Sequence, residues 1–210
     1  MKVILFDLDG TLLDSEQVAR EARNYGFQRV LGRSVMSEEE AFFLGKPVRK
    51  VLLEWFPDQA EELSSVIRDQ YTKLSQYVQP YTGIIEMLNQ LKAEGYTLGI
   101  VSSKRNHNIE RELEVTGLAP YFDTVVGQDD TEKHKPDPTP LLLALNRLRA
   151  TPESCTYIGD QPTDIQAAHH AGIRHIAVIW GDGDEQRFSG EIKTFIARTP
   201  QEVLQLFLRG

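Results

Sequence analysis

Two aspartates separated by one residue stand out near the start of the chain. Asp7 and Asp9 directly follow the apolar run Val3–Phe6, which predicts a buried strand. Gly10 and Thr11 then turn the chain. Two carboxylates at this point would repel each other unless a cation or a proton relieved them. The pattern indicates a metal site with a potential nucleophile, and an ordinary Asp-rich turn is the alternative at this point.

Further polar side chains follow three more predicted strands: Ser102 and Ser103 after TLGIV, Lys135 in KHKPDP after FDTVVG, and Asp160 with Asp164 after CTYIG. Ligands of α/β proteins collect at the carboxyl ends of parallel strands, so four loops bring these groups to one edge. The combination fits phosphoryl transfer. Mg²⁺ takes one or two protein carboxylates plus phosphate, while a lysine, a hydroxyl and backbone amides hold the phosphoryl oxygens. An aspartate can be the covalent nucleophile.

Strands and helices alternate in the second part of the chain, which predicts an α/β fold with a central parallel sheet. We expect strands over 3–6, 97–102, 122–127, 155–159 and 175–180, and helices over 84–95, 106–116, 139–150, 163–172 and about 200–209. Residues 15–77 carry apolar side chains at helical spacing throughout, and QPYTG at 79–83 is typical of a linker. The predicted domains are therefore a core of 1–14 plus 82–210 and an inserted helical domain of 15–81.

Composition excludes several classes of protein. The net charge of −8 would repel a phosphate backbone, and no basic stripe with interleaved aromatics occurs, so we expect no nucleic-acid partner. No apolar run approaches the ~20 residues that span a bilayer, so we expect no membrane partner and a cytoplasmic location. The single cysteine, Cys155, lies in a predicted buried strand and is expected to be a core residue.

The chain resembles the haloacid dehalogenase (HAD) superfamily over its whole length. DLDGT matches the first family motif, VSS the second, Lys135 in KPDP the third and GDQPTD the fourth. The similarity is closest to the branch of phosphoglycolate phosphatase, pyrophosphatase and beta-phosphoglucomutase. It implies a Rossmann-like three-layer core with a central parallel sheet plus an inserted all-helical cap domain. It also implies Mg²⁺ as cofactor and a small phosphorylated metabolite as partner. We expect the protein to be a monomer or homodimer.

The resemblance implies a role for each motif residue. Asp7 attacks phosphorus and becomes an aspartyl phosphate, and Asp9 protonates the leaving oxygen and then activates water. Magnesium is held by the side chain of Asp7, the backbone carbonyl of Asp9 and Asp160, with Asp164 in support. The phosphate-binding set consists of Ser102, the Ser103 amide, Lys135 and Thr11, which orders the turn. An acid at position 9 favours P–O chemistry, since relatives that cleave carbon–halogen bonds lack it.

Some residues keep two interpretations. Asp164 could cap the helix that begins beside it, support the metal, or do both. In the expected cap domain, Arg49 and Lys46 could meet a second anionic group of the substrate or form a solvated helix face. Trp180 is expected to pack rather than to contact substrate. The five histidines show no spacing typical of a zinc site and are expected to be structural or exposed.

We therefore predict a magnesium-dependent phosphatase that acts through an aspartyl phosphate on phosphoglycolate, pyrophosphate or a sugar phosphate. A beta-phosphoglucomutase-like phosphomutase is one alternative. Mutase-like relatives often carry an apolar residue where this chain has Thr11, so the threonine favours hydrolysis. An alternative of another class is a non-catalytic sensor of a phosphorylated ligand, against which the intact pair of Asp7 and Asp9 argues.

Overall fold

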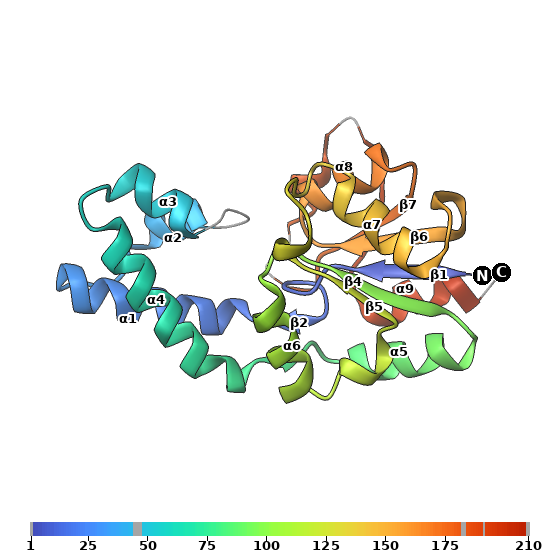
Figure 1. The fold of residues 1–210 in the computed structure, drawn as a ribbon, viewed down its shortest axis with the longest axis horizontal. Helices are drawn as coiled ribbons and strands as arrows, with labels where there is room; N and C mark the ends of the chain where they lie inside the picture. Colours follow the sequence, from blue (N-terminus) through green and yellow to red (C-terminus); the bar gives the residue numbers. More distant parts are fainter. Residues whose placement is uncertain (1, 44–47, 182–183, 191, 209–210) are drawn as a thin grey trace. The chain divides into compact units, whose positions relative to one another are not determined.

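The computed structural model describes residues 2–43, 48–181, 184–190 and 192–208. The chain divides into two compact units, Met1–Asp14 with Gln79–Gly210 and Ser15–Val78. Figure 1 shows the six-stranded sheet in the first unit and a group of helices in the second. The second junction lies at Val78, whereas the sequence predicts it after residue 81, because residues 79 and 80 pair with the first part of the chain. The roles of the units as core and cap stay predictions.

A six-stranded parallel sheet forms the centre of the first unit, which confirms the predicted α/β fold. The strand order is β5-β4-β1-β6-β7-β8, and each neighbouring pair is parallel. The strands are β1 (Val3–Phe6), β4 (Thr97–Val101), β5 (Thr124–Val126), β6 (Cys155–Gly159), β7 (Arg174–Val178) and β8 (Phe195–Ala197). All four residues of β1 are buried, as expected of a central parallel strand that is covered on both faces.

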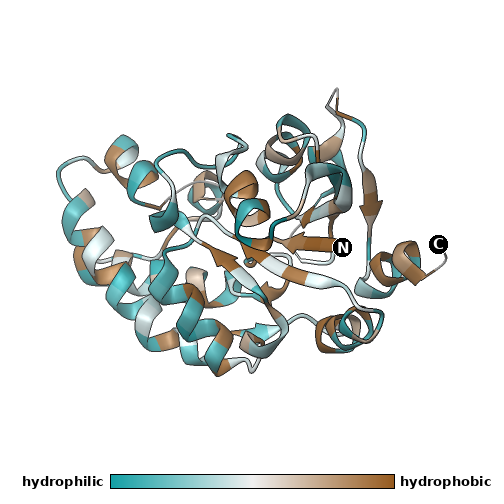
Figure 2. Ribbon diagram, turned by 45° about the vertical axis from the view of Figure 1, so that its right-hand side comes forward, coloured by the Kyte–Doolittle hydropathy of each residue, from teal (hydrophilic) through white to brown (hydrophobic). Residues whose placement is uncertain are grey.

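Helices cover both faces of this sheet. They are α5 (Ile84–Ala93), α6 (Asn106–Val115), α7 (Thr139–Leu148), α8 (Pro162–His170) and α9 (Pro200–Leu208), with single 3₁₀ turns η2 (Ala119–Tyr121), η3 (Gln128–Asp130), η4 (Pro152–Ser154) and η5 (Glu185–Phe188). Helices α7 and α8 lie on one face, and α5 and α9 pack together on the other (Figure 1). Figure 2 shows that the strands carry predominantly hydrophobic residues, so the sheet supplies the core that both helical layers cover.

Three short strands do not follow from the sequence pattern. The edge strand β8 coincides with the short apolar run Phe195–Ala197, which by itself does not distinguish a strand from a loop. The strands β2 (Leu13–Asp14) and β3 (Gln79–Pro80) form a separate antiparallel pair in which Leu13 faces Pro80 and Asp14 faces Gln79. Because proline and glycine lie close together in QPYTG, residues 79–83 are predicted as a linker. In the structure, Gln79 and Pro80 of this segment also pair with Leu13 and Asp14, which follow β1 in the chain.

The second unit is helical throughout its described residues. Its helices are α1 (Glu16–Leu31), α2 (Ser37–Phe43), α3 (Val48–Trp55) and α4 (Ala60–Leu74), followed by η1 (Ser75–Tyr77). Buried apolar side chains from all four α-helices form its core, with Phe27 packed edge-on against Phe43 and Phe56. No helix among the described residues of the chain combines the length and apolarity needed to cross a membrane.

Candidate active site

The turn after β1 brings the first predicted site residues to the carboxyl edge of the sheet. The backbone N–H of Asp7 donates to the Ile158 carbonyl at 2.8 Å, which continues the pairing of β1 with β6. Gly10 follows at a φ of +75°. A Cβ at this position would lie 2.4 Å from Oδ2 of Asp160, so glycine is required both by the backbone and by the close approach of the turn to that carboxylate.

Three buried carboxylates converge beneath this turn. Asp7, Asp160 and Asp164 each offer one oxygen, and these oxygens all lie within 4.8 Å of one another. Hard carboxylate oxygens are the ligands that Mg²⁺ prefers. Three acids beside one lysine also leave an excess of negative charge that a divalent cation would balance. The donor set therefore fits magnesium. Among the described residues, the Asp9 carboxylate is not part of this group, and the metal contact of its backbone carbonyl stays a prediction.

Lys135 lies in the middle of the acidic cluster. Its Nζ is 3.0 Å from Oδ1 of Asp7 and 2.6 Å from Oδ1 of Asp164. It also donates to the hydroxyl of Tyr157 at 3.0 Å and to the Val101 carbonyl at 3.3 Å. The lysine is buried rather than solvated, so its ammonium is held at a fixed point beside the Asp7 carboxylate.

Burial and the neighbouring charges both shift the pKa values of the groups in this cluster. Desolvation raises the pKa of Asp7 from 3.8 to about 7; Asp164 and Asp9 add to the rise, and Lys135 opposes it. Burial also raises the pKa of Asp160 well above its ordinary value, with the charges of Asp7 and Asp164 acting in the same direction. For Lys135, burial alone would lower the pKa, but the charges of Asp164 and Asp7 outweigh it and the pKa is raised.

Of the two roles predicted for Asp164, the structure shows the capping of helix α8. Its Oδ2 accepts the backbone N–H of Gln161 at 2.9 Å, which closes the first turn of α8 as a capping interaction. Its Oδ1 meanwhile contacts Lys135 and lies 3.3 Å from the hydroxyl of Tyr157. The same carboxylate thus fixes the helix and faces the cluster, and its metal-supporting role stays a prediction.

Asp9 lies apart from the three-acid group and contacts a different lysine. Oδ1 of Asp9 accepts from Nζ of Lys104 at 2.6 Å, and the same ammonium lies 2.5 Å from Oε2 of Glu112. Lys104 belongs to the loop between β4 and α6, and Glu112 to α6. Asp7 and Asp9 therefore lie beside different lysines, Lys135 and Lys104.

The remaining predicted core residues surround this edge. The Thr11 hydroxyl donates to Oδ1 of Asp160 at 3.2 Å, in keeping with its predicted ordering of the turn, and the Trp180 indole N–H donates to the Thr11 carbonyl at 2.9 Å. Ser102 directly follows Val101, whose carbonyl contacts Lys135, and its Oγ accepts the backbone N–H of Lys104 at 3.2 Å. Ser103 is exposed. Trp180 is thus held by the turn that carries Thr11, and its packing role stays a prediction.

Of the two basic residues predicted to contact substrate from the helical unit, the structure describes only Arg49. Arg49 is described on α3, where its guanidinium pairs with Glu61 and its side chain is 63% exposed. Lys46 lies outside the described residues. A role for either in substrate binding stays a prediction.

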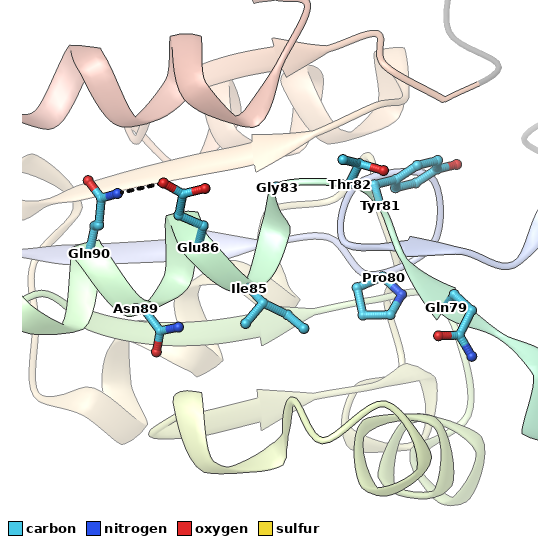
Figure 3. Close-up of a pocket in the computed structure, with 9 residues that line it drawn as sticks. All are labelled: Gln79, Pro80, Tyr81, Thr82, Gly83, Ile85, Glu86, Asn89 and Gln90. Carbon is cyan, nitrogen blue, oxygen red and sulfur yellow. Dashed lines mark hydrogen bonds between the residues drawn. The ribbon is translucent and has the colours of Figure 1, made fainter.

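A separate hollow of about 580 Å³ lies along β3 and the first part of α5. It is lined by Gln79, Pro80, Tyr81, Thr82, Gly83, Ile85, Glu86, Asn89 and Gln90. In Figure 3, Ile85 and Asn89 project from one side of α5, while Glu86 and Gln90 project from the other and share a hydrogen bond of 3.2 Å. It shares no residue with the acidic cluster and contains none of the predicted site residues.

Three residues of the site are not predicted from the sequence: Lys104, Glu112 and Tyr157. A lysine two positions after Ser102, in a loop at the carboxyl end of a strand, is a signal that could have identified Lys104. Tyr157 is concealed within a strand whose other residues are apolar or small. Its hydroxyl nevertheless points at Lys135 and at the Val101 carbonyl, 2.9 Å away.

Residues 4–178 match the sequence profile of a family described as haloacid dehalogenase-like hydrolase. A pyrophosphatase of Bacillus velezensis is 31% identical over 204 residues, covering 97% of this chain and 94% of that protein. A phosphoglycolate phosphatase of Aquifex aeolicus is 32% identical over 208 residues, covering 98% and 96%. A solved haloacid dehalogenase-like hydrolase of Streptococcus pneumoniae has a TM-score of 0.87 at 28% identity, covering 99% of this chain and 98% of that one.

Proposed function

Because the chain belongs to the haloacid dehalogenase-like hydrolase family, we propose that it is a magnesium-dependent phosphatase that forms an aspartyl phosphate on Asp7. The observation that carries the proposal is the contact between Lys135 and Asp7, 3.0 Å, within a group of three buried carboxylates. A cation-ready cluster with a lysine beside one carboxylate suits the transfer of a phosphoryl group to that carboxylate.

In the first half-reaction, a carboxylate oxygen of Asp7 attacks phosphorus and the bond to the leaving oxygen breaks. Lys135 and Ser102 bind the phosphoryl oxygens, which carry the developing charge. Asp9 donates its proton to the leaving oxygen, so that a poor leaving group departs without a full negative charge. Magnesium, held by Asp7, Asp160 and the backbone carbonyl of Asp9 with Asp164 in support, would supply charge neutralisation at the same oxygens.

In the second half-reaction, water attacks the aspartyl phosphate. Asp9 takes the proton from that water, the bond between phosphorus and the Asp7 oxygen breaks, and inorganic phosphate leaves. Asp9 is thereby returned to its protonated state and Asp7 to its carboxylate. The Asp9 carboxylate lies outside the group of three acids, which leaves it available for proton exchange rather than for binding a cation through its side chain.

We propose pyrophosphate, 2-phosphoglycolate or a small sugar phosphate as substrate. The pyrophosphatase and the phosphoglycolate phosphatase that resemble this chain match almost its full length, which supports the first two. All three candidates present a terminal phosphoryl group on a small, polar leaving group. The phosphoryl-binding residues read only that shared group, so the reaction class is the same for each.

The test is a panel of these compounds with the purified protein, assayed for released phosphate with and without magnesium. We expect one of them to exceed the others in kcat/KM, with turnover that requires magnesium and is absent in Asp7→Asn. A requirement for a bisphosphate activator without release of phosphate would identify a mutase. Failure to turn over any compound, p-nitrophenyl phosphate included, would refute the proposed phosphatase and favour a binding protein.

A further inference from the structure

Glu112 is a charged residue in an apolar position. It lies on α6 with none of its side chain exposed, and Oε2 is 2.5 Å from Nζ of Lys104. Burying an ionised carboxylate is unfavourable unless a cation or several hydrogen bonds compensate it. The burial of Glu112 therefore holds the Lys104 ammonium at one place.

The backbone of Lys104 is fixed as well. Its N–H donates to Oγ of Ser102 at 3.2 Å, and its carbonyl accepts the N–H of Gln128 at 2.8 Å. The first bond ties the lysine to the end of β4, and the second ties it to the loop after β5. Both ends of this flexible side chain are thus attached to rigid elements, which leaves little rotamer entropy to be lost when it binds a partner.

The same ammonium lies 2.6 Å from Oδ1 of Asp9. The Asp9 side chain is 37% exposed, so burial alone does not fix its orientation, whereas the Lys104 side chain is only 11% exposed. We propose that Glu112 and Lys104 are positioning residues that hold the Asp9 carboxylate toward the leaving group. This inference rests on the proposed function, in which Asp9 transfers the proton.

A positioning role of this kind has a specific kinetic signature. A leaving group that is a weak acid, such as an alkyl alcohol, needs its proton during bond cleavage, whereas dinitrophenolate departs without one. Misplacing Asp9 should therefore slow cleavage of alkyl phosphates much more than cleavage of dinitrophenyl phosphate. A merely structural ion pair between Lys104 and Glu112 would affect both substrates equally.

The test uses the double variant Lys104→Met/Glu112→Leu in the full-length protein with magnesium. Removing both partners avoids an unpaired buried carboxylate. We expect the single-turnover rate with an alkyl phosphate to fall by about tenfold or more, with a much smaller change in the burst of dinitrophenolate from dinitrophenyl phosphate. The single variant Lys104→Arg, which keeps a positive charge beside Glu112, should show a smaller loss than the double variant. Lys92→Met, which removes the ammonium that lies 3.0 Å from Asp123 on the surface, is the matched control and should change neither rate.

Repeating the double substitution in an Asp9→Asn background separates the two explanations. If Lys104 acts through Asp9, the selective loss should vanish there, because the residue being positioned is gone. Equal losses for both substrates, or the same loss in both backgrounds, would overturn the inference. If the double variant does not fold, as judged by circular dichroism, Glu112→Gln provides the same comparison with a nearly isosteric side chain. A wild-type protein that cleaves neither phosphate ester would instead refute the proposed function itself.

Discussion

The phenolic oxygen of Tyr157 lies 3.0 Å from Nζ of Lys135, the lysine that contacts the carboxylates of Asp7 and Asp164. The same hydroxyl lies 2.9 Å from the Val101 carbonyl and 3.3 Å from Oδ1 of Asp164. One buried side chain of β6 thus touches the backbone of β4, the lysine and one of the acids. Because Tyr157 is fully buried on an inner strand of the sheet, water cannot take over the hydrogen bonds of its hydroxyl.

Tyr157→Phe should destabilise the protein, because it removes a buried hydroxyl that is fully hydrogen-bonded. We expect a loss of about 1 kcal/mol, and up to about 3 kcal/mol if the Lys135 ammonium loses a needed partner. Urea unfolding measures the difference. Tyr121→Phe, which removes an exposed hydroxyl that donates to Asn89 at 2.9 Å, is the control and should cost less than about 0.5 kcal/mol. Equal losses in the free energy of unfolding for the two variants would show that burial does not determine how much each hydroxyl contributes to stability.

Asp7→Asn should abolish turnover without unfolding the chain, since it removes the nucleophile and keeps the shape of the side chain. The loss in kcat should exceed about 10³-fold. Phosphate release measures the activity, and thermal unfolding verifies that the variant is folded. Retained activity in a folded Asp7→Asn variant would exclude an aspartyl phosphate at this position.

Asp9→Asn should still allow attack on an activated ester but stall the second half-reaction, because no base remains to activate water. Incubation with dinitrophenyl phosphate should then trap one phosphoryl group on Asp7. Mass spectrometry of the intact protein and of its peptides locates the added phosphate. If no adduct forms although dinitrophenolate is released, Asp9 does not act in dephosphorylation.

Magnesium should stabilise the folded protein, because Asp7, Asp160 and Asp164 place three oxygens within 4.8 Å of one another. At a concentration one hundred times the Kd, the gain is about 2.7 kcal/mol, seen as a rise in Tm that EDTA reverses. Asp160→Asn should reduce this rise. The matched control is Asp123→Asn, which changes an acid at a surface ion pair with Lys92 and should leave the magnesium response intact. An unchanged response in Asp160→Asn would remove Asp160 from the cation site.

The helical unit should lose stability in acid through Glu39. Its carboxylate accepts from both terminal nitrogens of Arg33, at 2.7 and 2.8 Å, and from the backbone N–H of Met36 at 2.8 Å. Arg33 lowers the pKa of Glu39 below its ordinary value of 4.5 and outweighs the opposing effect of burial. Since the folded pKa is depressed, the stabilisation is fully present above pH 4.5 and is lost as the pH falls through the folded value.

Glu39→Gln should therefore unfold more easily than the wild type at pH 7, and the two proteins should converge in acid. Chemical unfolding monitored between about pH 7 and about pH 3 measures this difference. A gap that persists undiminished at the lowest pH would show that the charge of Glu39 is not the origin of the stabilisation.

The sequence predicts the parallel sheet and the residues at its edge, and the match to the haloacid dehalogenase-like hydrolase family confirms the predicted resemblance. Asp7, Asp160, Asp164 and Lys135 could be identified because each follows a strand whose apolar residues are visible as a run, and the fold brings strand ends together. The structure indeed gathers these four residues into one cluster.

The interactions that the sequence does not reveal depend on side-chain direction. Lys104 meets Glu112 only because α6 turns that glutamate inward, against the general tendency of glutamate to remain exposed. Tyr157 looks like one more core residue of a buried strand until its hydroxyl is placed beside Lys135. The short pair of β2 and β3 has two residues in each strand, so no periodicity marks it.

That short pair has a consequence for how such a protein can diversify. Because Asp14 lies directly opposite Gln79, the inserted stretch leaves and re-enters the sheet-containing unit at neighbouring backbone positions. A tight turn could therefore join Asp14 to Gln79 in place of residues 15–78. A different insert whose own ends lie close together could be placed at the same two positions. Recombination at this junction would exchange a whole module while every strand of the sheet kept its partners.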